Sequence, residues 1–359
     1  MEFALSADQR QFQESLDRTL ERLSPLSRVR RFADETEPVA RDVWRGLADL
    51  GAAAVLIPEA HGGLGLTLLD AALVAEALGR FAAPSPFLGS AVLAPLALLQ
   101  GSDAQQARWL PKLAAGEAIA GVAIAEAVAG ARDGGGVTAS GGKLNGKALF
   151  VIDAAEADLF IVADTARALH LVDGGAAGLT RIPLASIDLT RRLGELRFED
   201  TPAEPLDARP DGLQRLRDAG WAMLAADALG ACDAMLAKAV AYAQERQQFG
   251  RAIGSFQAVK HLCAEMAAEI EPARSLVWYA AYALSEGLDD GPLAAAHAKA
   301  HLSEIGRFVA RTATEVHGGM GITDLLGLHY WFKRIGLDRQ LLGGPERVRH
   351  LAAVMQGFA

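Results

Sequence analysis

The sequence YAQERQQFGRAIGSFQAVK, residues 242–260, connects two long apolar segments and decides how the chain is organised. It carries two arginines, Arg246 and Arg251, and it places Gln257 in the first turn of a new helix. Guanidinium groups bind phosphate through paired hydrogen bonds, and the free N–H groups at a helix start also favour an anion. The stretch therefore fits a phosphate-bearing ligand, while a polar connector between two bundle helices has the same composition.

Long helical patterns flank this stretch on both sides. Apolar residues recur at helical spacing over 211–246, 256–286 and 291–316, and over a shorter segment at 345–357. Long, largely apolar helices with short connections are typical of a four-helix bundle. We therefore expect a C-terminal helical bundle domain over residues 209–359.

The rest of the chain divides into two parts. Residues 1–118 show helical patterns, which predict an N-terminal α-helical domain. Residues 119–208 contain short β-type runs broken by Gly, Asp and Asn, with Asn145-Gly146 as a turn signal. These runs predict a middle β-domain that forms a small antiparallel sheet or barrel. The predicted fold class is α+β and mostly α.

Composition excludes several classes of protein. Lys and Arg number 35 against 44 Asp and Glu, a net charge of −9, which argues against nucleic acid as the main partner. The two cysteines, Cys232 and Cys263, lie in apolar helical patterns and read as core residues, not as a disulfide or metal ligands. Neither a secretory signal nor a membrane span is visible. We expect a cytoplasmic protein without a metal.

The same stretch, read as Arg246-x-x-Phe249-Gly250 followed by Gln257, resembles a motif of the acyl-CoA dehydrogenase family. The sequence VHGGMGIT, residues 316–323, resembles a second motif, and the likeness spans nearly the whole chain. It implies the family's helix, sheet, helix layout and an FAD cofactor. In the family, these motifs hold the adenine and pyrophosphate side of FAD across a subunit interface. The cofactor-binding residues that it implies are Arg246, Phe249, Gly250, Gln257, Gly318 and Gly319.

The resemblance also shows where a catalytic base is missing. In the family, a carboxylate removes a proton next to the thioester carbonyl, and it occupies one of two positions. These positions fall on Gly343 and Gly220, and glycine cannot take a proton. Glu346 reads as a first-turn acid of the last helix. Asp227 shares the helix face of Gly220, about 10 Å along the axis. It is the best candidate base in the chain, and a buried pair with a basic side chain is the alternative.

The motifs that face the flavin ring are altered as well. The family's glutamate-proline-glycine-x-glycine-serine becomes EAVAGA at residues 126–131, without the proline and the serine. The family's tryptophan-isoleucine-threonine becomes Phe150-Val151-Ile152, and Ile152 has no hydroxyl to offer the flavin. The motifs that reach a neighbour's FAD are therefore present, and those that hold the chain's own flavin ring are eroded.

This pattern predicts a flavoprotein oxidoreductase of lipid β-oxidation, an FAD-dependent acyl-CoA dehydrogenase. We expect it to be a subunit that completes the FAD site of a base-bearing partner in a hetero-oligomer. Two alternatives stay open: a self-sufficient homo-oligomer with a displaced base, and a non-redox acyl-CoA-binding or scaffold protein. The family's partners would be an acyl-CoA substrate and electron-transfer flavoprotein or a similar acceptor. The two glycines at the base positions suggest room for a bulky acyl group, such as a steroid side chain.

Overall fold

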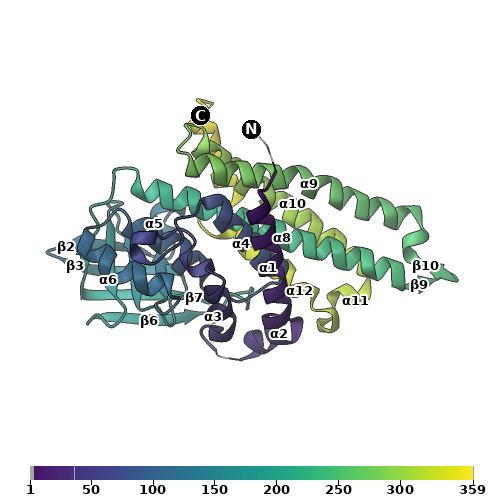
Figure 1. Cartoon of the computed structure of the whole chain (residues 1–359), viewed down its shortest axis with the longest axis horizontal. Helices are drawn as coiled ribbons and strands as arrows, with labels where there is room; N and C mark the ends of the chain where they lie inside the picture. Colours follow the sequence, from purple (N-terminus) through teal and green to yellow (C-terminus); the bar gives the residue numbers. More distant parts are fainter. Residues whose placement is uncertain (1–3, 36, 359) are drawn as a thin grey trace.

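The computed structural model describes residues 4–35 and 37–358 and shows helices at both ends of the chain with a sheet between them (Figure 1). The N-terminal part is helical. Its α-helices are α1 (Ala7–Leu23), α2 (Leu26–Asp34), α3 (Arg41–Asp49), α4 (Leu68–Arg80), α5 (Ala94–Leu98) and α6 (Asp103–Ala114). Three short non-α turns join them: η1 (Ala52–Ala54), η2 (Glu59–His61) and η3 (Leu88–Leu93).

The middle part is an eight-stranded sheet with the order β6-β7-β3-β1-β4-β5-β8, and β2 pairs with β3. Its elements are β1 (Ala120–Ala123), helix α7 (Ala125–Ala129), β2 (Gly136–Ser140), β3 (Lys143–Ile152), β4 (Leu159–Ala163), β5 (Leu169–Asp173), β6 (Leu179–Leu184), β7 (Leu193–Pro202) and β8 (Glu204–Pro205). The pairs are antiparallel except β1 with β4. That exception is possible because the β2–β3 hairpin separates these two strands in sequence and supplies the crossover length.

The turn predicted at Asn145-Gly146 is wrong, because the hairpin turn lies elsewhere. Gly141 and Gly142 connect β2 to β3 instead, with φ angles of +57° and +74°. Gly146 lies inside β3 with φ +116°, at a register shift against β7. Glycine serves both places because it adopts positive φ without a steric penalty, at a tight turn and at a bulge alike.

The C-terminal part is built on three long helices. Its elements are α8 (Gly212–Glu245), β9 (Gln247–Gln248), β10 (Arg251–Ala252), η4 (Ile253–Ser255), α9 (Gln257–Ser285), α10 (Gly291–His317), α11 (Gly319–Ile322), η5 (Asp324–Leu326), α12 (Leu328–Gln340) and α13 (Pro345–Met355). Sequence patterns did not predict α12, which packs on α8 and α10. The β9–β10 hairpin directly follows the C-terminal end of α8 and lies far from the sheet (Figure 1). The predicted domain division after residues 118 and 208 stays a prediction.

Helices α4 and α8 cross with their backbones in contact. A Cβ on Gly79 would lie 1.9 Å from the carbonyl oxygen of Asp227, and a Cβ on Gly230 would lie 1.8 Å from that of Glu76. Only glycine allows so close an approach. This crossing joins the N-terminal helices to the bundle in one continuous hydrophobic core.

Candidate functional site

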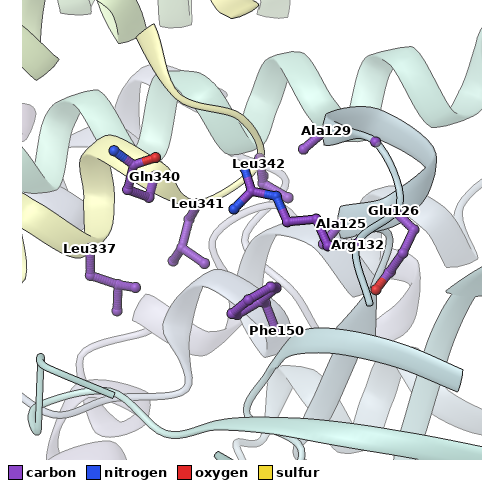
Figure 2. Close-up of a pocket in the computed structure, with 10 residues that line it drawn as sticks. Ala125, Glu126, Ala129, Arg132, Phe150, Leu337, Gln340, Leu341 and Leu342 are labelled. Atoms are coloured by element: carbon purple, nitrogen blue, oxygen red, sulfur yellow. The ribbon is translucent and has the colours of Figure 1, made fainter. Parts of the chain in front are cut away.

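A small pocket lies where the middle part of the chain meets the C-terminal part. It is formed by α7, by Phe150 of β3, by the end of α12 and by the turn Leu341–Leu342 that follows (Figure 2). Its volume is about 110 Å³. A larger apolar groove of about 540 Å³ adjoins it between residues 184–188 and α12, and the two share Phe150, Leu337 and Gln340 in their walls.

Both positions that carry a base in the family adjoin Leu342, a residue that lines this pocket. Leu342 and Gly343 form the turn before α13 with φ angles of +57° and +112°. The indole Nε1 of Trp221 donates to the carbonyl oxygen of Leu342 at 2.9 Å and fixes the turn on α8. A Cβ on Gly220 would lie only 2.4 Å from Cδ1 of Leu342. The leucine therefore occupies the space beside Gly220, and the expected room for a bulky acyl group is absent there.

Neither carboxylate near the pocket takes the place of the missing base. Glu126 stands at the opposite edge from Leu337 (Figure 2), and its Oε1 accepts a hydrogen bond from the backbone N–H of Leu149 at 2.6 Å. Burial raises the pKa of Glu126. Glu346 is exposed and pairs with Arg339 at 3.1 Å, and hydrogen bonding at the start of α13 lowers its pKa. Each carboxylate thus has a partner of its own and serves to hold local structure.

Asp227 is held in a buried ion pair. Its two carboxylate oxygens accept hydrogen bonds from Nε and Nη2 of Arg334, each at 2.7 Å, and Nη2 of Arg191 lies 2.7 Å from Oδ2. Burial acts to raise the pKa of Asp227, but the two arginines outweigh it and lower the pKa to about 2. Asp227 lines neither cavity. We therefore correct its assignment as the candidate base: a carboxylate that is held this firmly is a poor proton acceptor.

The flavin-facing motifs keep the shape of a site without its polar groups. Phe150 has φ +54° at a register shift between β3 and β7, and its half-exposed ring forms part of both cavities. Ile152 is buried and pairs in register with Val122 of β1. The pocket therefore offers an aromatic surface and backbone groups, while the hydroxyl that the family places beside the flavin is absent.

The two motifs that in the family hold a neighbour's FAD lie together here at the far end of the bundle. The rings of Tyr242 on α8 and His317 on α10 stack with their centroids 4.6 Å apart. Phe249 is 93% exposed at the tip of the β9–β10 hairpin, with φ +52°. Arg246 and Gln257 are exposed beside it. We call this surface the tip; it consists of Tyr242, Arg246, Phe249, Gly250, Gln257, His317, Gly318 and Gly319.

The glycines of the tip leave open space. In the part of the chain that the structure describes, no atom beyond the local backbone and chain neighbours lies within 4 Å of the position that a Cβ would take on Gly250, Gly318 or Gly319. Gly250 and Gly318 have φ angles of +75° and +57°. An open glycine surface with an exposed arginine suits close approach of a phosphate to backbone N–H groups. The residues present therefore fit the adenine and pyrophosphate side of FAD.

The tip is far from the pocket of the same chain. Gly220 and Arg246 stand 26 positions apart on α8, which is about 39 Å along a helix axis. No side chain spans that separation, so the tip residues do not reach the pocket of their own chain.

Two family models match this chain over most of its length. The acyl-CoA dehydrogenase N-terminal domain matches residues 6–117, and the acyl-CoA dehydrogenase C-terminal domain matches residues 218–356. A curated relative, acyl-CoA dehydrogenase IpdE2 of Mycobacterium tuberculosis, is 36% identical over 85% of this chain and 84% of its own length. The chain belongs to the acyl-CoA dehydrogenase family. It is an oxidoreductase with FAD as its cofactor.

Solved structures of acyl-CoA dehydrogenases have the same fold. The ChsE4-ChsE5 complex from Mycobacterium tuberculosis matches with a TM-score of 0.91 and 27% identity, covering 100% of both chains. A variant of the Tcur3481-Tcur3483 steroid ACAD matches with a TM-score of 0.89 and 28% identity, covering 98% of both chains. The predicted family and fold class are confirmed by these likenesses and by the two family models.

Some features of the acyl-CoA dehydrogenase site were not singled out from the sequence. Arg132 and Arg347, which approach the pocket, carry no motif of their own. The packing of Leu342 on Gly220 joins residues more than a hundred positions apart, so local patterns do not reveal it. In the described residues, no group of His, Cys, Asp and Glu side chains could hold a metal ion, and no helix is long and apolar enough to cross a membrane.

Proposed function

We propose that this acyl-CoA dehydrogenase is a subunit that completes the FAD site of a second, base-bearing chain. The observation that carries the proposal is the contrast between its two half-sites. The tip keeps the exposed Arg246, Phe249 and Gln257. The pocket, about 39 Å away along α8, has Leu342 packed against Gly220 where the base would stand.

The chain's own residues have separate tasks in this arrangement. FAD, when bound, accepts the hydride from the acyl thioester. Arg246 holds negative charge on the pyrophosphate, and the open backbone around Gly318 and Gly319 allows close approach. The partner supplies the carboxylate that removes the α-proton, because neither Gly343 nor Gly220 carries one.

The comparisons support pairing of unlike chains. The names of two structural neighbours, the ChsE4-ChsE5 complex and the Tcur3481-Tcur3483 steroid ACAD, each join two components. By analogy, we assign to this chain a second acyl-CoA dehydrogenase subunit as its partner and an acyl-CoA with a bulky acyl group, such as a steroid side chain, as the substrate of the pair. Electron-transfer flavoprotein or a similar acceptor would reoxidise the flavin.

The flavin content of the chain, alone and paired, tests this proposal. We expect the chain purified alone to be colourless and inactive toward a panel of acyl-CoA thioesters. Co-expression with base-bearing acyl-CoA dehydrogenase chains of the same organism should give one complex that binds one flavin for every two chains, because only the partner's pocket is complete. A yellow single chain that acyl-CoA bleaches would overturn the proposal and indicate a self-sufficient enzyme.

A further inference from the structure

The pocket of this chain has unpaired positive charge at its edge. Figure 2 shows the Arg132 guanidinium pointing from the end of α7 toward the turn at Leu341 and Leu342, above the Phe150 ring. Within residues 4–35 and 37–358, this guanidinium has no ion pair and no hydrogen bond. Because a guanidinium keeps its charge at every physiological pH, Arg132 is a fixed cation in the pocket wall.

A second guanidinium crosses the same turn. Nε of Arg347 donates to the carbonyl oxygen of Val128 at 3.2 Å, which ties α13 to α7. Its Nη1 lies 3.4 Å from the position of a Cβ on Gly130, and its Cδ lies 3.7 Å from that of a Cβ on Gly343. An arginine thus passes directly beside the position where the family carries its carboxylate.

Among the described residues, no acid forms an ion pair with either of these two arginines. Glu126 faces the backbone N–H of Leu149, and Glu346 pairs with Arg339 on the outer side of α13. The other walls are apolar, with Leu337, Leu341 and Leu342 facing Phe150. Both guanidinium groups are exposed at the rim, so they attract an anion through solvent, while the apolar walls favour a ligand that also buries hydrocarbon.

We propose that this pocket binds an aliphatic carboxylate. Arg132 and Arg347 would bind the carboxylate, since guanidinium and carboxylate groups match in geometry and charge. The aliphatic chain would lie in the adjoining groove of about 540 Å³, which Phe332 and Ile187 line with exposed apolar surface. The polarity of the family's site is reversed: here the protein supplies the cation and the ligand supplies the carboxylate.

This inference rests on the proposed pairing, because a self-sufficient chain would hold its own flavin in the pocket that Phe150 and Leu342 line. The two proposals fail separately: the flavin content of the chain alone tests the pairing, and titration of the flavin-free chain with octanoate tests the pocket.

Isothermal titration calorimetry of the full-length chain with sodium octanoate tests the site. We expect saturable one-to-one binding of octanoate and at least tenfold weaker binding of 1-octanol, which has the same chain length without the charge. Butanoate should bind more weakly than octanoate, because each buried methylene adds favourable transfer free energy. Equal binding of octanoate and 1-octanol would overturn the proposal, and tighter binding of octyl phosphate would assign the site to a phosphate instead.

Substitutions locate the binding site. Arg132→Gln should weaken octanoate binding at least tenfold, and Arg132→Lys should recover part of the loss because it keeps the charge without the planar fork. Phe332→Ser should reduce the difference between octanoate and butanoate. The matched control is Arg311→Gln, which removes an exposed arginine of α10. Octanoate affinity that is the same in the Arg132 and Arg311 variants would exclude the pocket as the site.

Discussion

At the scale of single residues, the packing around Gly220 leaves no space for the side chain of a base. Leu342 occupies the space beside Gly220, and Trp221 holds the carbonyl oxygen of Leu342 in place. A side chain at position 220 must displace the end of a buried leucine before it can approach a substrate.

Gly220→Ala should reveal this contact. An alanine in place of an exposed helix glycine stabilises by about 1 kcal/mol, but at position 220 the new methyl group meets Cδ1 of Leu342. We expect Gly220→Ala to bring no gain in the parent protein. In a protein that also carries Leu342→Ala, the same substitution should stabilise, which gives a coupling energy of about 1 kcal/mol between the two positions. Urea unfolding of the four proteins of the cycle measures the coupling. A coupling energy near zero would show that Leu342 does not restrict position 220.

Asp227 gives a second prediction at this scale. Asp227→Asn removes the negative charge between Arg334 and Arg191 and should cost about 3–5 kcal/mol of unfolding free energy, as breaking a buried ion pair does. Asp211→Asn is the matched control: its pair with Arg215 is more than half exposed, so the change should stay below about 1 kcal/mol. Equal effects of the two substitutions in urea unfolding would contradict the structural role of Asp227.

At the scale of elements, the crossing of α4 and α8 restricts the bundle most tightly. Gly230→Ala places a methyl group against a backbone carbonyl of Glu76, which cannot rotate away as a side chain can. We expect a loss of at least about 3 kcal/mol, at the upper end of overpacking costs. Gly336→Ala in α12 meets no atom within 4 Å and should instead stabilise by up to about 1 kcal/mol. Thermal unfolding of both variants tests this difference. A Gly230→Ala protein that melts at or above the melting temperature of the parent would contradict the tight contact at Gly230.

We expect the contact between the ends of α8 and α10 to weaken at low pH. Burial lowers the pKa of His317 below its ordinary value, so the folded state favours the neutral ring that stacks on Tyr242. The unfolded chain takes up the proton first as the pH falls, and stability decreases below about pH 6.5. His317→Phe keeps the stacking and removes this proton. Between pH 7.5 and pH 5.5, the melting temperature of the parent should fall by more than that of the variant. An equal fall in both would contradict a lowered pKa of His317 in the folded state.

At the scale of the whole molecule, the tip and the pocket of one chain are far apart, so a substitution in the tip should leave the pocket unchanged. Arg246→Gln should leave the melting temperature unchanged, since Arg246 is exposed, and should weaken flavin binding at least tenfold in the complex with the partner. Arg311→Gln serves as the control for loss of one exposed positive charge. Flavin fluorescence quenching measures the affinity. An unchanged affinity would exclude Arg246 as a ligand of the neighbour's cofactor.

Helical periodicity predicted the fold class, because long amphipathic patterns follow directly from the burial of one helix face. The hairpin turn was misplaced since Asn145-Gly146 and Gly141-Gly142 both satisfy a local turn, and only the pairing of β3 with β7 distinguishes them. The motifs of the tip could be read because they are contiguous in sequence. The contact of Leu342 with Gly220 and the charge around Arg132 depend on segments that are far apart in the chain, so no local pattern could predict them.

Helix α8 runs without a break from the contact of Gly220 with Leu342 to the tip, so in the proposed pair its length would set the distance between this chain's pocket and the partner's cofactor. One inserted residue after Gly230 would move everything beyond it by about 1.5 Å and turn it by about 100° around the axis. In the proposed pair, Arg246 and Phe249 would then face away from the partner's cofactor, although the helix itself would stay intact. Insertions and deletions between Gly230 and Arg246 should therefore be tolerated far less than substitutions on the exposed face of the same helix.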